Sequence, residues 1–162
     1  YETNLNLASF KPDFNFYEEH SPIYTHRRDL PASKFNSCTL KEVLAADGSI
    51  ITDSDITRSI IGVRTIVEAG CELNGVVCMG ADFYETEERR RQNRVAGIPD
   101  IGIGTNSKVA GAIIDKDARI GENCRIGFDR AFYEDGDFPT HYVRDGVIII
   151  PKGAAVPPGT VI

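Results

Sequence analysis

The chain has 162 residues, no tryptophan, and 24 acidic against 18 basic side chains, which gives a formal net charge of −6 at pH 7. That length suits one domain, and the acidic balance argues against nonspecific binding to nucleic acid. No apolar stretch approaches the length of a membrane-crossing helix, and no signal peptide opens the sequence. Because the chain begins at Tyr1 without a methionine, we expect it to be a piece of a longer protein.

Residues 1–36 carry no repeat. Residues 1–7 are typical of the end of a helix, whereas three prolines interrupt the stretch after them, so residues 11–36 are predicted to form an extended linker. This segment is rich in aromatic side chains, which we expect to pack on the side of the next domain or on a domain absent from the chain. We therefore place a domain boundary between residues 36 and 37.

An aliphatic residue recurs every six positions through most of residues 37–162. Gly or Asp often stands beside it, and a small residue comes four positions later, which is typical of a parallel β-helix whose chain turns a corner every six residues. Neither a helix, with period 3.6, nor an alternating strand, with period 2, explains that spacing. Grouped in threes, the aliphatic residues predict an all-β domain of about five hexapeptide coils: Leu44, Ile50, Ile56; Ile61, Val67, Leu73; Met79, Ile103, Val109; Ile114, Ile120, Ile126; and Ile150, Val156, Ile162.

Two insertions interrupt the coils, and insertions in solenoids often carry the particular function. The first, residues 84–100, is dominated by charged helix formers that end at Gly97, which predicts a short exposed helix. The alternative for this segment is a phosphate or partner site. The second insertion, residues 130–146, is acidic and aromatic. The arginines that would form the alternative site are Arg89, Arg90, Arg91 and Arg94.

The sequence offers little catalytic machinery. It contains no phosphate-binding glycine loop and no nucleophile elbow, and His141 is the one candidate for the general base of an acyltransferase. The other two histidines lie in the linker, so a three-histidine zinc site is not expected. Cys71 and Cys124 each come four positions after an aliphatic residue of the repeat, which favours small apolar corner fillers in a reducing compartment over a metal site or disulfide. We therefore assign no catalytic residue and no metal ligand.

A pair of lysines is the best candidate site. Lys116 lies two residues after Ile114, and Lys152 lies two residues after Ile150. The coil count puts both on the same face of consecutive coils, with backbones about 4.8 Å apart. Two ammonium groups at that distance repel each other, and a bound phosphate or carboxylate would relieve the repulsion. The competing explanation is a surface mixture of charges, because aspartates flank Lys116 on both sides.

Two strings in the chain are much more specific than the six-residue repeat, which many transferases share. The strings Met79-Gly-Ala-Asp-Phe-Tyr-Glu-Thr86 and Ala112-Ile-Ile-Asp-Lys-Asp-Ala-Arg-Ile-Gly121 resemble the C-terminal domain of ADP-glucose pyrophosphorylase (glucose-1-phosphate adenylyltransferase), more the plant and cyanobacterial type than the enterobacterial one. Further matches occur in the same order over nearly the whole chain. The resemblance implies that the β-helix is left-handed and that residues 1–36 lead from a missing catalytic domain.

The resemblance also implies a function for the intact protein. Its N-terminal nucleotidyltransferase domain would form ADP-glucose and pyrophosphate from ATP and glucose 1-phosphate, with Mg²⁺, for glycogen or starch synthesis. The β-helix domain would hold the oligomer together, a tetramer in the family, and take part in allosteric control. By itself the fragment is expected to be inactive and to need no cofactor. The location would be the bacterial cytoplasm or the plastid stroma.

In plant-like members of this family, a lysine in the Ile-Ile-Asp-Lys string and a lysine near the C-terminus bind the activator 3-phosphoglycerate or competing phosphate. The matching residues are Lys116 and Lys152, with Asp115 and Arg119 as minor contributors. The arginines that complete the family's site belong to the missing domain. Two alternatives remain open: a hexapeptide-repeat acyltransferase and an assembly module without a ligand.

Overall fold

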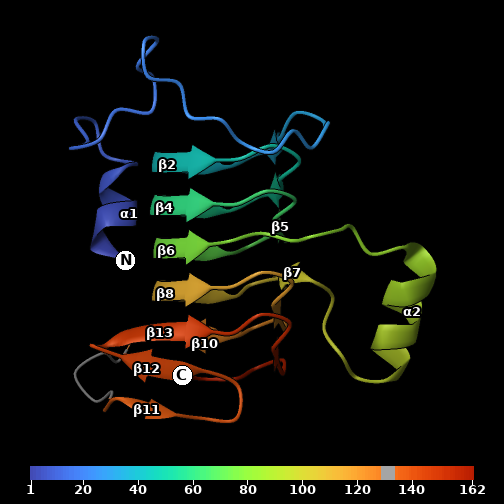
Figure 1. Cartoon of the computed structure of the whole chain (residues 1–162). Coiled ribbons are helices and arrows are strands. Elements are labelled where there is room, and N and C mark those ends of the chain that lie inside the picture. Colours follow the sequence, from blue (N-terminus) through green and yellow to red (C-terminus); the bar gives the residue numbers. More distant parts are fainter. Residues whose placement is uncertain (129–133) are drawn as a thin grey trace.

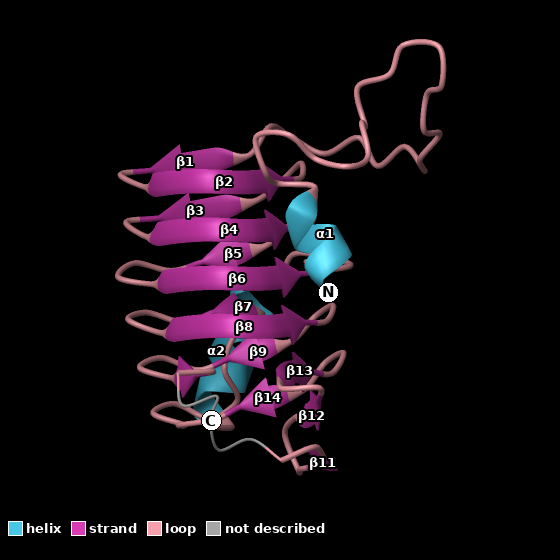
Figure 2. Ribbon diagram, turned by 90° about the vertical axis from the view of Figure 1, so that its left-hand side faces the viewer, coloured by secondary structure: helices cyan, strands magenta, loops and turns pink. Residues whose placement is uncertain are grey.

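The computed structural model describes residues 1–128 and 134–162, and its body is a prism of stacked parallel strands (Figures 1 and 2). One wall is a six-stranded parallel sheet, and six strands on one wall enclose five full turns of the chain. The all-β parallel helix predicted from the sequence is confirmed. The strands of this wall, in order, are β1 (Lys34–Asn36), β3 (Ile50–Thr52), β5 (Ile66–Val67), β7 (Gly102–Ile103), β9 (Arg119–Ile120) and β14 (Ala155–Val156).

The other two walls are formed by longer strands that bend around a corner. Each seven-residue strand has a residue with positive φ at its centre, for example Arg58 and Gly75, which turns the second half of the strand onto the next wall. Strand β8 therefore pairs with β10 through its first half and with β13 through its second half. These walls comprise β2 (Thr39–Ala45), β4 (Asp55–Ile61), β6 (Glu72–Cys78), β8 (Lys108–Ile114), β10 (Arg125–Ile126) and β13 (Val147–Ile150).

The residues at the remaining corners suit their backbone. Asp53, Gly70, Asn106 and Asn123 all have positive φ and occupy equivalent turns of four successive coils. Asn and Asp tolerate this left-handed conformation better than other residues that carry a Cβ, because their short polar side chains bond to the local backbone. The Asn, Asp and Gly residues between the aliphatic positions therefore form the turns that allow each coil to close.

The core is a set of aliphatic columns that run along the prism axis. Ile51, Val67, Ile103, Ile120 and Val156 stack on one wall, and each is at most 1% exposed. Burying each of these aliphatic side chains stabilises the fold by roughly 1.5–3 kcal/mol. Because every coil contacts only its neighbours, this stabilisation is distributed along the stack.

Three of the predicted core positions are wrong by one residue, and two of them are Ile50 and Met79. Ile50 is 38% exposed and its neighbour Ile51 is buried, and Met79 is 46% exposed while Cys78 points inward. The step from one core column to the next along the bent strands is five residues, because a single residue forms the corner there. Counting six residues therefore overshoots at Met79.

The first coil contains the third error. Ala45, rather than Leu44, pairs with buried Ile61 and continues that core column. Leu44 pairs with Ile60 and points to the outside of the wall, where it is half-buried. The predicted register is therefore correct from Ile51 onward except at the Met79 corner.

The N-terminal segment lies on the outside of the prism. Helix α1 (Glu2–Asn6) stands where the sequence predicted a helix end, and it packs its buried Leu5 near strands β4 and β6. Residues 7–33 contain no helix or strand and pass over the first coil (Figure 1). Phe10, Tyr17 and Tyr24 are each more than 80% exposed, so these three do not pack on the β-helix. The other alternative, that they pack on a domain absent from the chain, stays a prediction.

The two insertions have different structures. Residues 84–100 contain helix α2 (Glu87–Val95), which stands off from the prism in Figure 1. Its N-terminus is capped by Thr86, whose side chain accepts a hydrogen bond from the Arg89 backbone. The second insertion forms an antiparallel hairpin of β11 (Gly136–Asp137) and β12 (Tyr142–Arg144) beside β13, and its residues 130–133 lie outside the described residues. Within the described part, no helix is long and apolar enough to cross a bilayer.

Candidate functional site

Register brings the two predicted lysines together. Ile114 at the end of β8 pairs directly with Ile150 at the end of β13, so the corners that come after them lie on adjacent coils. The carbonyl oxygen of Lys116 accepts a hydrogen bond of 2.9 Å from the N–H of Gly153, the residue after Lys152. The predicted juxtaposition of Lys116 and Lys152 is confirmed.

Both ammonium groups bind one carboxylate. Lys116 Nζ lies 2.7 Å from Oδ1 of Asp82, and Lys152 Nζ lies 2.6 Å from Oδ2 of the same side chain. Asp82 comes from the preceding coil, just before the insertion that carries α2. The side chains are 32%, 57% and 41% exposed for Lys116, Lys152 and Asp82, so an ion from solvent can reach all three. We call Lys116, Lys152 and Asp82 the clamp, because two ammonium groups hold one carboxylate between them.

The backbone holds Asp82 over the lysines. Its own N–H donates a 2.8 Å hydrogen bond to Oδ1 of Asp117, and the N–H of Asp117 donates to the carbonyl of Gly80. The other oxygen of Asp117 lies 3.7 Å from Lys152 Nζ. Ala81, next to Asp82, is buried and bonded through its N–H to the Val63 carbonyl. The backbone at Ala81 and Asp82 is therefore held in place by hydrogen bonds to the neighbouring coils.

Charges in the clamp shift the ionisation of its members. The hydrogen bonds from Lys116 and then Lys152 hold the pKa of Asp82 well below its usual range, because both stabilise the ionised carboxylate. The hydrogen bond with Asp82 correspondingly raises the pKa of Lys152. Asp115 is turned toward the backbone, where its Oδ1 accepts a 2.7 Å hydrogen bond from the N–H of Lys116. At neutral pH, Asp82 and Lys152 are thus both ionised.

Arg119, predicted as a minor contributor, is engaged elsewhere. Its guanidinium lies 2.6 Å from Oε1 of Glu85 and also donates to the carbonyl of Pro99, at 2.7 Å. The Glu85 side chain is only 1% exposed, and its carboxylate also accepts from Asn93 and from the N–H of Ile101. The structure therefore does not place Arg119 on the lysine pair.

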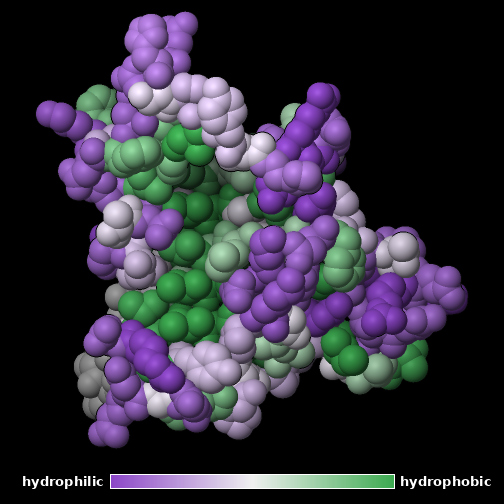
Figure 3. Space-filling view, in the orientation of Figure 1, coloured by the Kyte–Doolittle hydropathy of each residue, from purple (hydrophilic) through white to green (hydrophobic). Residues whose placement is uncertain are grey.

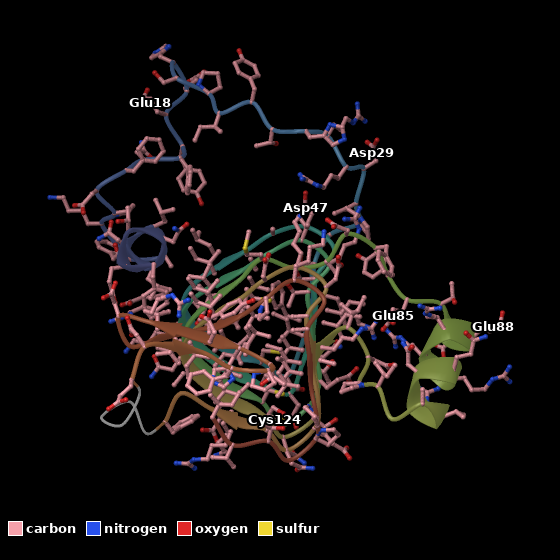
Figure 4. The ribbon with its side chains drawn as sticks, turned by 60° about the horizontal axis from the view of Figure 1, so that its bottom comes forward. Glu18, Asp29, Asp47, Glu85, Glu88 and Cys124 are labelled. Carbon is pink, nitrogen blue, oxygen red and sulfur yellow. The ribbon has the colours of Figure 1, made fainter. Side chains whose placement is uncertain are left out.

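Glu85 anchors both ends of the first insertion. Burial by itself would raise the pKa of Glu85, but hydrogen bonds from Arg119, the Ile101 backbone and Asn93 outweigh it and lower the pKa. Figure 4 shows Glu85 between the prism and α2, whereas Glu88 points away from it. An ionised, fully bonded Glu85 ties the start of the insertion to its end.

The arginines of α2 do not form a positive patch over the wall. Arg90 and Arg94 line a hollow of about 440 Å³ between the insertion and the prism, but Glu68 and Glu122 line the same hollow. Nη1 of Arg94 also lies 3.5 Å from Oδ2 of Asp100. The mixed lining favours the solvated-helix interpretation over a phosphate site at this place.

The remaining candidates stand apart from the clamp. His141 lies in the hairpin, stacked on Phe138 with ring centroids 4.6 Å apart. Cys71 and Cys124 are buried free thiols in the core, so their prediction as corner fillers is confirmed. Burial raises the pKa of Cys71 to about 11. Within the described residues, no group of three or more His, Cys, Asp or Glu side chains is placed to hold a metal ion.

Asp82 is the member of the candidate site that was not predicted from the sequence. It lies in the Met79–Thr86 string, but the six-residue repeat stops there, so no coil position was assigned to it. The hydrophobic period gives no signal for this position, because the position depends on backbone dihedrals. Gly80 and Asp117 have positive φ at the same corner of successive coils, which puts Asp82 next to the Lys116 turn.

The chain is similar to known proteins of one family. The model of the GLGC left-handed parallel beta-helix domain matches residues 28–161. The large subunit 1 of glucose-1-phosphate adenylyltransferase, chloroplastic/amyloplastic, from Zea mays is 38% identical over 164 aligned residues. That alignment covers 100% of this chain and 32% of the maize protein, so the chain spans about a third of the length of that relative.

Proposed function

Because the chain belongs to the family of GLGC left-handed parallel β-helix domains, we propose that it is the regulatory domain of a glucose-1-phosphate adenylyltransferase and that Lys116 and Lys152 bind an anionic effector. The observation that carries this proposal is the convergence of both Nζ atoms on one carboxylate, at 2.7 and 2.6 Å. Charge-assisted hydrogen bonds of this kind are suited to a phosphate or carboxylate group. The effector would be a phosphorylated metabolite such as 3-phosphoglycerate, or inorganic phosphate.

The catalytic step belongs to the rest of the protein. The intact enzyme would form ADP-glucose and pyrophosphate from ATP and glucose 1-phosphate, with Mg²⁺ bound to ATP in the nucleotidyltransferase domain. This chain would contribute effector binding and assembly. The name of the maize relative supports an adenylyltransferase context and, for that protein, a plastid location. For this chain we propose the plastid stroma or the bacterial cytoplasm.

One outer wall of the prism is suited to the catalytic domain. The register aligns the outward side chains of five successive strands into a half-buried aliphatic ladder, and Figure 3 shows a hydrophobic band over this stack. Such a continuous apolar surface commonly marks an interface. The ladder consists of Leu44, Ile60, Val77, Ile113 and Ile149.

The first coil is suited to assembly with another subunit. Strands β1 and β2 stand at the end of their sheets, and Phe35 and Leu40 are 42% and 40% exposed there. Residues 7–33 pass over this end but leave Phe35 and Leu40 exposed, and an apolar strand edge that is not fully covered invites pairing with another chain. We therefore place a contact of the proposed homo- or hetero-oligomer at this end.

The effector assignment is tested by calorimetry on the full-length protein that contains this chain. Lys116→Gln and Lys152→Gln should each weaken the binding of inorganic phosphate about tenfold to a hundredfold, because each removes one charge-assisted bond. Lys108→Gln is the matched control, since Lys108 is a comparably exposed lysine paired with Glu72. If the enzyme without both site lysines still binds phosphate and is still activated, the assignment fails, and a purely structural assembly role is favoured.

A further inference from the structure

We propose that Asp82 is an internal ligand of the lysine pair, which an anionic effector must displace before it can bind. The inference rests on the proposed function of the pair and adds how the site is regulated. In the unliganded protein the clamp would be closed by the chain itself. Binding would then be an exchange of one oxyanion for another.

The geometry of Asp82 is that of a ligand. Each carboxylate oxygen meets a different ammonium group, at 2.7 Å from Lys116 and 2.6 Å from Lys152. Two oxygens of a phosphate group would take the same two positions, because both groups present adjacent anionic oxygens to a pair of donors. Asp82 therefore stands where the effector is expected, rather than beside it.

The charges of the clamp do not allow Asp82 and an effector to stay together. Two ammonium groups face the carboxylates of Asp82 and Asp117, and Asp115 adds a third carboxylate next to Lys116. A phosphate with a charge between about −1.5 and −2 would be repelled by this set. With Asp82 turned away, the two lysines face one fewer carboxylate and a vacated oxyanion position. A dianion therefore binds the two lysines by displacing Asp82.

Asp82 is also placed so that it can leave. Its side chain is 41% exposed, so water that returns to the carboxylate offsets much of the loss of its two ion pairs. On one side, Ala81 is buried and bonded to the prism. On the other, Tyr84 Oη donates a 2.6 Å hydrogen bond to the Gly48 carbonyl, and Glu85 is buried. The movable piece is therefore the short stretch 82–84 between two fixed points.

The same competition selects the class of effector. A monocarboxylate offers the lysines no more than Asp82 already does, and it has to be brought from solution. A phosphate group adds charge and a third oxygen, so it can outcompete the internal carboxylate. The site is accordingly expected to respond to phosphate-bearing anions and to ignore acetate.

The test compares phosphate binding by the full-length wild type and by Asp82→Asn, measured by calorimetry. Asparagine keeps the shape and removes the charge, so the clamp should open and bind phosphate about 10- to 100-fold more tightly, as expected when the competent state is a minority of roughly 1–10%. Asp29→Asn is the matched control, because it removes an equally charged partner from the exposed Arg27 pair and should leave affinity unchanged.

Hydrogen exchange gives a second, independent readout. The N–H of Asp82 is bonded to Asp117, so phosphate should raise exchange in a peptide covering residues 79–86 of the wild type and leave it unchanged in Asp82→Asn. The proposal is overturned if Asp82→Asn binds phosphate no more tightly than wild type, or if phosphate binds without raising exchange there. If replacing Lys116 and Lys152 leaves phosphate binding intact, the effector site itself fails instead.

Discussion

The register of the core gives the sharpest test of the fold, because two adjacent isoleucines have opposite environments. Ile51 is completely buried, whereas Ile50 is 38% exposed on the outside of the same strand. Replacing Ile51 by Ala removes three carbon groups, which forfeits about 2.4 kcal/mol at about 0.8 kcal/mol each. The cavity left behind raises the total to about 3–4 kcal/mol. Ile50→Ala leaves no closed cavity and should cost about 1 kcal/mol or less.

Urea denaturation followed by circular dichroism measures both free energies of unfolding. The Ile51→Ala midpoint should fall well below that of the Ile50→Ala variant, with similar slopes. The two substitutions are chemically identical and one position apart, so helix or strand propensity cannot explain a difference. Equal losses, or a larger loss at Ile50, would refute this register.

Three further predictions concern the buried groups. The lowered pKa of Glu85 means that its pairing with Arg119 stabilises the fold above the unfolded value of about 4.3 and is lost as pH falls through the folded value. As the pH is lowered below about 4, the urea concentration at the midpoint of unfolding should therefore fall for the wild type and fall less for Glu85→Gln. Parallel curves of midpoint against pH for the two proteins would contradict this. Glu85→Ala should release the insertion, so that trypsin cleaves after Arg89 about tenfold faster, and an unchanged rate would show that other contacts hold α2. Because burial raises the pKa of Cys71 to about 11, iodoacetamide at about pH 8 should label it only in urea; labelling of the native protein would contradict its burial.

The period of six in the sequence was sufficient to predict the prism and most of its core. Columns such as Ile103, Ile120 and Val156 lie where the count put them, because one aliphatic side chain per wall is what a closed coil can bury. The count failed at Met79, where a one-residue corner shortens the step to five. Corner length depends on backbone dihedrals, which a hydrophobic pattern does not encode.

The candidate site was predicted only in part, for a related reason. Lys116 and Lys152 occupy equivalent places in the repeat, so counting coils brought them together. Asp82 and Glu85 lie where the chain leaves the repeat for the insertion, and nothing in a period says where a departing segment turns. Their partners depend on tertiary contacts with residues more than thirty positions away.

A crystal structure of the full-length protein grown with inorganic phosphate tests the central claim most directly. The displacement model predicts a phosphate bound within hydrogen-bonding distance of the Nζ atoms of both Lys116 and Lys152, with the Asp82 carboxylate turned away. Phosphate bound elsewhere, with Asp82 still bridging the two lysines, would contradict it.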